Sequence, residues 1–277
     1  MLTRMAARKP KASGRIFVGV GGWNFAPWRG LFYPRGLPHA RELAYMSGEL
    51  SSIEINSTFY GLQKPATFQR WHDETPEGFV FAVKAPRFVT GRRDLATAAD
   101  GIARFLDSGV LRLARKLGPL NWQLAPFKRF VAAEVDAFLG LLPKEHNGMT
   151  LRHAIEVRHA SFVVPEFVRL ARHHGVAIVL AGDAKYPQIA NVTAPFAYLR
   201  IMGTVDTEKA GYASTALTRW ARQAKALAAG KRPAGLYLVP EEPAGKITAR
   251  EVFLYVISGA KHRNPAAARA LLEKLRR

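Results

Sequence analysis

The stretch SSIEINSTFYG (residues 51–61) decides the fold class, because it begins as a strand whose two faces differ in kind. Ile53 and Ile55 alternate with Glu54 and Asn56, and successive side chains of a strand point to opposite faces. One face is therefore apolar, while the other ends in a carboxylate and an amide where a core would be expected. A site at the end of the strand would explain this polar face.

The rest of the chain repeats the order strand, loop, helix, which predicts a parallel sheet covered by helices. About eight such units in one uninterrupted chain favour an α/β fold of the TIM type, a closed (β/α) barrel, over an open sheet. Strands are predicted at 15–20, 51–56, 79–84, 120–124, 153–158, 176–182, 196–203 and 251–259, and helices at 41–50, 65–74, 97–117, 131–142, 165–174, 214–230 and 265–277. Irregular segments are predicted at 183–195 and 235–247.

The composition predicts one domain and a basic protein. Residues 15–277 form the predicted barrel domain, and residues 1–14 are predicted to be a disordered basic tail. Lys and Arg number 41 against 21 Asp and Glu, a formal net charge of +20, which attracts polyanions. The charge is not gathered into one tract, so nucleic acid is kept as an alternative partner.

Other compositional features exclude several classes of protein. The chain has no cysteine, which excludes disulfides and thiolate chemistry and suits the cytoplasm. No apolar run approaches the roughly 18 residues of a membrane span, so no membrane association is expected. The oligomeric state is left open.

Polar residues occupy the inward positions at the carboxyl ends of the predicted strands, where barrels of this kind place their sites. They are Glu54, Asn56, Lys84, Gln123, Glu156, Arg158, Asp183, Tyr198 and Arg200. Unpaired buried ions are costly, so these groups are expected to pair with one another around a polar pocket.

These residue types predict acid–base chemistry on an anionic substrate. Glu54 and Glu156 are predicted as catalytic base and acid, as in hydrolysis, and Lys84 as a third catalytic residue. Lys84, Arg158 and Arg200 would hold an anion such as phosphate. Asn56 and Gln123 are predicted to orient the substrate, and Trp23 and Tyr60 to form stacking walls. A Schiff base at Lys84 is an alternative that nothing in the sequence favours.

No metal or cofactor is expected. Only His159 of the eight histidines lies at a predicted strand end, and GVGG (19–22) matches neither a phosphate loop nor a dinucleotide motif. A Mg²⁺ site at Glu54, Glu156 and Asp183 is a weaker alternative. The loop aromatics between Trp23 and Tyr33 would either stack a base or sugar or pack as a lid.

Six segments of the chain carry a family resemblance. They are VGVGGWNFAPWRGLFYP (18–34), IEINSTFYG (53–61), TPEGFVFAVKAPR (75–87), KLGPLNWQLAP (116–126), AIEVRH (154–159) and YLRIMG (198–203). Together they resemble the YecE-like family, the domain-of-unknown-function family numbered 72. The resemblance implies a TIM barrel related to the endonuclease IV and xylose isomerase group, with motif positions at Trp23, Glu54, Asn56, Tyr60, Lys84, Gln123, Glu156, Arg158 and Arg200. It implies no established activity.

The chain departs from this family pattern at Gly91, where a histidine is common, and across residues 258–264, where asparagines are usual.

The sequence as a whole predicts a barrel enzyme, with hydrolysis as the leading reaction class, that acts on a phosphorylated or nucleotide-like substrate. Two alternatives stay open: a non-catalytic nucleic-acid-binding protein, and a carbohydrate-active isomerase or glycosidase.

Overall fold

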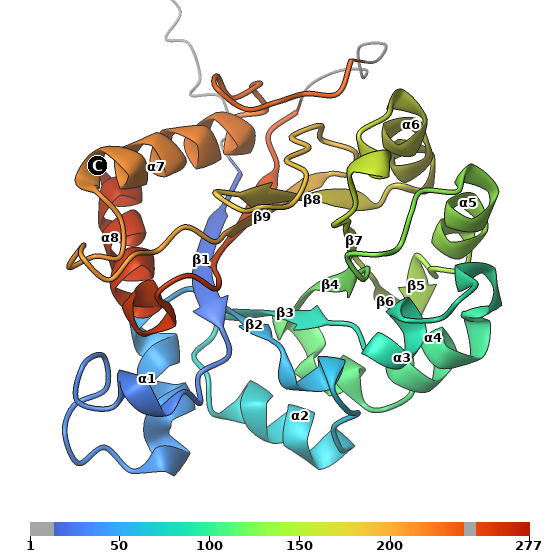
Figure 1. The fold of residues 1–277 in the computed structure, drawn as a ribbon. Helices are drawn as coiled ribbons and strands as arrows, with labels where there is room; N and C mark the ends of the chain where they lie inside the picture. Colours follow the sequence, from blue (N-terminus) through green and yellow to red (C-terminus); the bar gives the residue numbers. More distant parts are fainter. Residues whose placement is uncertain (1–13, 241–247) are drawn as a thin grey trace, which may run out of the picture.

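The computed structural model describes residues 14–240 and 248–277, which fold into a closed barrel of parallel strands surrounded by helices (Figure 1). Around the barrel the strand order is β1-β10-β9-β8-β7-β4-β3-β2. The strands are β1 (Ile16–Gly21), β2 (Ser52–Ile55), β3 (Val80–Lys84), β4 (Leu117–Gln123), β7 (His153–Glu156), β8 (Ala177–Gly182), β9 (Phe196–Ile201) and β10 (Glu251–Val256). This confirms the predicted TIM-type barrel.

The helices lie outside the barrel, and α7 and α8 pack against each other (Figure 1). They are α1 (Glu42–Glu49), α2 (Pro65–Asp73), α3 (Arg87–Thr90), α4 (Ala99–Leu106), α5 (Ala132–Gly140), α6 (Pro165–His174), α7 (Ser214–Ala228) and α8 (Asn264–Arg276). A short antiparallel pair, β5 (Glu145–His146) and β6 (Met149–Thr150), lies outside the barrel. The sequence analysis did not predict this pair.

The alternation of side chains along each strand divides the core into two parts. Ile53 and Ile55 point outward into the apolar layer between sheet and helices. The inside of the barrel is filled by a separate cluster in which Phe17 stacks on Phe253 with ring centroids 5.0 Å apart. Tyr198 continues this cluster toward the carboxyl ends of the strands. The barrel is therefore packed at its centre, and the polar strand ends lie above an apolar floor.

The predicted helix over 97–117 is wrong in its second half. Helix α4 ends at Leu106, and a 3-10 segment follows from Val110 to Lys116. Gly109 breaks the helix because its φ of 103° is left-handed, and a Cβ there would lie 2.6 Å from the Pro65 Cα. The irregular link 183–195 is as predicted.

Two other predictions fall partly outside the described residues. Most of the predicted tail (1–13) lies outside them, and so do residues 241–247 of the segment 235–247. Within the described part of that segment, Tyr237 accepts a backbone hydrogen bond from Ala190. None of the described helices is long and apolar enough to cross a membrane.

Candidate active site at the carboxyl end of the barrel

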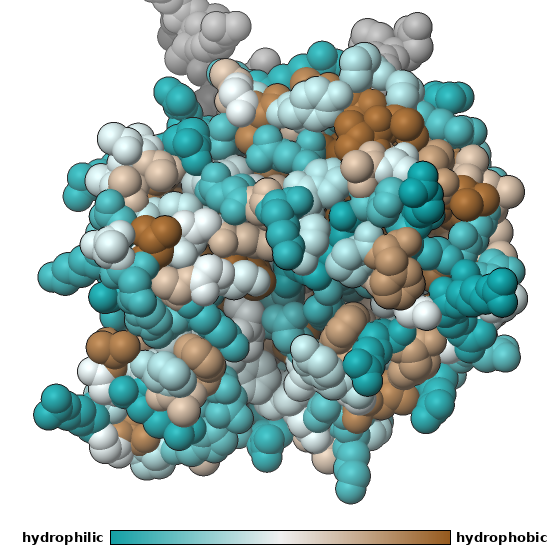
Figure 2. Space-filling model, viewed as in Figure 1, coloured by the Kyte–Doolittle hydropathy of each residue, from teal (hydrophilic) through white to brown (hydrophobic). Residues whose placement is uncertain are grey.

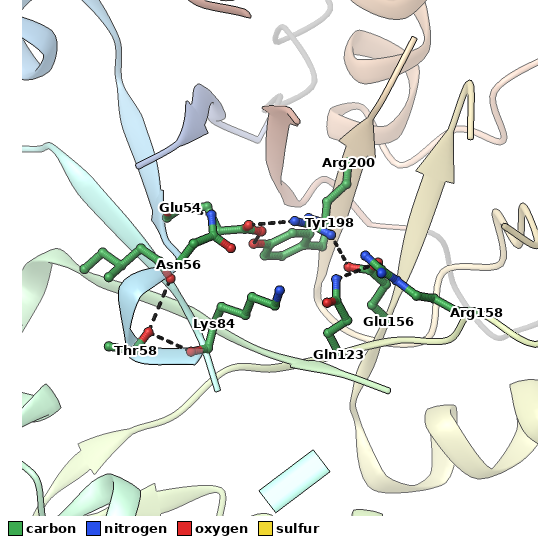
Figure 3. A network of polar contacts seen from close by, with 10 residues as sticks. Glu54, Asn56, Thr58, Lys84, Gln123, Glu156, Arg158, Tyr198 and Arg200 are labelled. Carbon is green, nitrogen blue, oxygen red and sulfur yellow. Dashed lines mark hydrogen bonds and ion pairs between the residues drawn. The ribbon is translucent and has the colours of Figure 1, made fainter. Parts of the chain in front are cut away.

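Five of the predicted site residues meet in one layer at the carboxyl end of the barrel (Figure 3). Glu54 comes from β2, Lys84 from β3, Gln123 from β4, Glu156 from β7 and Arg200 from β9. The strands are parallel, so their carboxyl ends share one rim, and the inward register of each strand aims its side chain at the axis. The sequence separation between these residues reaches 146 positions.

The Arg200 guanidinium holds the two carboxylates together from opposite sides. Its Nη2 donates to Glu54 Oε1 at 3.0 Å, and its Nη1 donates to Glu156 Oε2. Tyr198 donates to the second oxygen of Glu54 at 2.5 Å. All four side chains are buried. Buried ions are costly unless they are paired, and here Arg200 pairs with both carboxylates. The opposing carboxylates keep the pKa of Arg200 above its usual value, although burial by itself acts the other way.

Glu156 also holds Arg158 and Gln123. Its Oε1 accepts from Gln123 Nε2 at 2.9 Å and from Arg158 Nε at 2.8 Å. Burial alone would raise the pKa of Glu156, but the charges of Arg200 and Arg158 outweigh it and lower that pKa to about 2. Glu156 is therefore ionised throughout the neutral range.

Lys84 lies beside this network without joining it. The Thr58 hydroxyl donates to the backbone oxygen of Lys84 at 2.7 Å, which fixes the base of the side chain. The Nζ atom lies 3.7 Å from the centroid of the Phe59 ring, and no hydrogen bond or ion pair joins it to another described residue. Burial and the nearby charge of Arg200 lower the pKa of Lys84 to about 8.

A pocket of about 910 Å³ opens above this layer. Five cationic side chains line it, and among the described residues no Asp or Glu does. The cations are Lys84, Arg87, Arg158, Arg200 and Lys261. Figure 2 shows that hydrophilic side chains predominate on the face of the molecule drawn there. The pocket is therefore suited to an anion, while both carboxylates lie beneath Arg200 and do not line it.

The remaining predicted residues lie at the side of this pocket. Asn56 and Tyr60 line it and also a second hollow of about 560 Å³, which Trp23 lines. Trp23 packs edge-on against Trp71 with centroids 5.0 Å apart, and Tyr60 is 75% exposed. Asn56 Nδ2 donates to the backbone oxygen of Glu54 at 3.2 Å. Asn56 thus stands between the two hollows.

One strand-end residue points away from the site. Asp183 accepts hydrogen bonds from Arg219 and from the Trp220 indole at 2.7 Å, both on α7. Asp183 has a φ of 51°, and this left-handed turn directs its side chain toward the helix. The weaker alternative of a Mg²⁺ site at Glu54, Glu156 and Asp183 is therefore wrong. No group of three or more potential ligands for a metal ion occurs within residues 14–240 and 248–277.

The sequence analysis missed several residues around the pocket. Arg87 and Phe59 follow strand ends, and Lys261 follows the last strand, so no strand pattern points to them. Asn121 is different, because it shares the inward face of β4 with Gln123 and pairs in register with Lys84. Its buried amide has no hydrogen-bond partner among the described residues. Alternation along β4 could have identified it.

A further cavity of about 530 Å³ lies at the amino end of the barrel, next to Gly175 and Arg250. It is bordered by residues 230–233 and 238–240. The amino end of such barrels contributes mainly to stability. The pocket at the carboxyl end is therefore the candidate active site.

The family of the chain follows from comparison with known proteins. A family model described as "Protein of unknown function DUF72" matches residues 17–277. The chain belongs to the DUF72 family. Two curated proteins to which the chain is similar carry UPF0759 names. YecE of Escherichia coli K12 is 30% identical over 150 residues, covering 53% of this chain and 50% of YecE. YunF of Bacillus subtilis is 26% identical over 157 residues, covering 55% and 54%.

This chain matches about half the length of these curated relatives. Solved structures of DUF72 proteins share its fold. One from Thermotoga maritima has a TM-score of 0.72 at 19% identity, covering 95% of this chain and all of the other. One from Enterococcus faecalis has a TM-score of 0.72 at 15% identity, covering 95% and 96%. The expected resemblance is thus confirmed. The sequence analysis expects departures from the family pattern at Gly91 and within 258–264, and the pocket is lined by Gly91 and, from that segment, by Ser258, Lys261 and Asn264.

Proposed function

We propose that this DUF72 protein is an enzyme whose pocket at the carboxyl end of the barrel binds an anionic, phosphorylated or nucleotide-like substrate. The supporting observation is the lining of the pocket, which has five cations and, among the described residues, no acid. Arg158 is the best placed of these to hold phosphate. Its side chain is partly exposed, and Glu156 orients it through Nε. Its Nη1 donates to the Tyr186 hydroxyl at 3.3 Å, whereas Nη2 makes no hydrogen bond to a described residue and is available to a phosphate oxygen.

The role of the two carboxylates bears on the reaction class. Hydrolysis with Glu54 and Glu156 as base and acid stays a prediction. With a pKa of about 2, Glu156 is ionised at neutral pH and cannot be the acid, and so weakly basic a carboxylate is also a poor general base. Both carboxylates hold Arg200, and Glu156 also orients Arg158, which supports a positioning role for them in the anion site.

A thermal-shift screen tests the substrate class. Inorganic phosphate, sugar phosphates, nucleotides and uncharged sugars are added to the wild type, to Arg158→Ala and to Arg219→Ala. Arg219 is an exposed arginine on α7 that pairs with Asp183 outside the pocket, so it serves as the matched control. We expect phosphorylated compounds to stabilise the wild type and Arg219→Ala. We expect these compounds to bind Arg158→Ala about 10- to 100-fold more weakly, because the variant lacks one charge-assisted contact. Stabilisation by uncharged sugars alone contradicts the proposal.

Exposed aromatics at the rim favour one second candidate, binding of single-stranded nucleic acid. Tyr60 is 75% exposed and Phe127 79% exposed, and both line the cationic pocket. Aromatic platforms beside cations are typical of sites that stack successive bases. Binding of an oligonucleotide would weaken with added salt, and Tyr60→Ala and Phe127→Ala would weaken it further. Tyr237→Ala is the control, because Tyr237 is exposed but lines neither this pocket nor its neighbour.

A further inference from the structure

Lys84 forms no ion pair with Glu54 or Glu156, whose charges are met by other side chains. All four oxygens of the nearby carboxylates are already occupied without it. Arg200 and Tyr198 bind the two oxygens of Glu54. Gln123, Arg158 and Arg200 bind those of Glu156. The four carboxylate oxygens therefore keep their hydrogen bonds when Lys84 is uncharged, and loss of the Lys84 proton leaves neither carboxylate without a cation.

The amine of Lys84 nevertheless reaches the pocket. Figure 3 shows its side chain extending toward the space between Glu54 and the Gln123–Glu156 pair, with no dashed contact at the nitrogen. Lys84 lines the pocket although it is only 8% exposed, and the Phe59 ring covers one side of the nitrogen at 3.7 Å. An unpaired, largely desolvated amine that opens into a pocket is the arrangement that lysine nucleophiles require.

We propose that Lys84 forms an imine with the carbonyl carbon of a phosphorylated aldehyde or ketone. The inference rests on the proposed anionic substrate, because the neighbouring arginines would hold the phosphate while the amine meets the carbonyl. This inference adds a reaction class to the anion site, namely carbonyl chemistry that proceeds through a covalent adduct on the lysine.

The step balances with water alone. The nitrogen lone pair forms the C–N bond, the C=O π electrons move to oxygen, and a proton passes from nitrogen to that oxygen to give a carbinolamine. The C–O bond then breaks, the second nitrogen proton leaves with the oxygen, and one water is released. Addition of water reverses both steps and regenerates the amine. No oxidant, reductant or metal takes part.

The lowered pKa of Lys84 supports this role. Burial and the charge of Arg200 bring it to about 8, from the usual 10.5. At pH 7 the fraction of neutral amine is then roughly 300-fold larger than for an ordinary lysine.

Reductive trapping tests the proposal on the full chain. The protein is incubated with dihydroxyacetone phosphate and sodium borohydride, which adds hydride to an imine carbon and makes the adduct permanent. Intact mass and peptide mapping then locate it. We expect one adduct per chain, at Lys84. We expect unphosphorylated dihydroxyacetone to need at least about 10-fold higher concentration, since it lacks the charged group that the arginines bind.

Two variants separate the covalent role from the electrostatic one. Lys84→Arg keeps the positive charge but cannot form an imine, so it should keep thermal stabilisation by dihydroxyacetone phosphate and lose the adduct. Lys225→Met removes an exposed lysine of α7, outside the pocket, and should leave trapping at Lys84 unchanged. Mapping on the wild type keeps the test valid even if a Lys84 variant folds poorly.

The possible failures are distinguishable. Thermal stabilisation by the phosphorylated probe without an adduct at Lys84 overturns the imine and leaves the anion site standing. An adduct at Lys84 that forms equally well with the unphosphorylated probe supports the nucleophile and contradicts the anionic substrate. Label spread over exposed lysines, or neither stabilisation nor an adduct, overturns the imine proposal.

Discussion

The Arg200 guanidinium donates a hydrogen bond to the Glu54 carboxylate across the inside of the barrel, at 3.0 Å. The two residues lie on β9 and β2, which are not neighbours in the sheet. Their contact therefore depends on closure of the barrel. It joins the first half of the chain to the second by a buried ion pair, and the two form one wall of the layer beneath the pocket.

Replacing Arg200 should destabilise the protein strongly. Arg200→Met leaves the buried carboxylates of Glu54 and Glu156 without their shared cation, and removal of one member of a buried ion pair costs about 3–5 kcal/mol. Urea unfolding measures the free energy. Arg219→Met, the exposed control, should lose less than about 1 kcal/mol. A loss below about 1 kcal/mol for Arg200→Met would show that the network contributes little to stability.

Glu156 should make the protein sensitive to acid. Its pKa is about 2 in the folded state against a usual value of 4.5, so the folded state favours the ionised form. The resulting stability is fully present above pH 4.5 and is lost as the pH falls toward 2, on the order of 3 kcal/mol in total. Unfolding free energies measured from pH 5 to pH 2 should fall less steeply in Glu156→Gln. Curves of equal slope for the two proteins would show that protonation of Glu156 is not the cause of the loss of stability in acid.

Lys84 should oppose stability at neutral pH. Its folded pKa of about 8 lies below the usual 10.5, so between these values the unfolded chain binds more protons and stability rises with pH. Below pH 8 the full cost of burying the charge is present, on the order of 3 kcal/mol. Lys84→Met removes this cost, so we expect it to be more stable than the wild type at pH 7.

The difference in unfolding free energy between Lys84→Met and the wild type should depend on pH. The stability advantage of the variant should shrink from pH 8 upward and vanish near pH 10.5, as seen by urea unfolding at several pH values. An advantage that stays constant across this range would arise from packing and not from the charge.

The rate of imine trapping at Lys84 should also depend on pH. Only the neutral amine attacks a carbonyl, so the initial rate should rise as the pH increases and level off above about 8. Trapping at exposed lysines should keep rising toward the usual 10.5. Quantitative peptide mapping at each pH follows both in one sample. If the rate at Lys84 rises in parallel with that at exposed lysines, its amine is not perturbed.

Much of this architecture is readable in the sequence because the signals are local. Alternation places Ile53 outward and Glu54 inward, and the strand–helix order requires a parallel sheet. The break at Gly109 was missed because it depends on how closely Pro65 approaches, which no local pattern records. Asp183 was misplaced because a left-handed turn, and not the strand register, sets its direction.

The sequence by itself determined the closed barrel, the polar ends of its strands and the membership in the DUF72 family. Tertiary structure alone decided which of those polar groups are paired and which face the pocket. Strand periodicity fixes the side of the sheet on which a residue lies, but pairing depends on distances across the barrel. Those distances leave Glu54 and Glu156 sealed beneath Arg200. They place the Lys84 amine against the Phe59 ring at the floor of a cationic pocket, without a hydrogen bond or ion pair to any described residue.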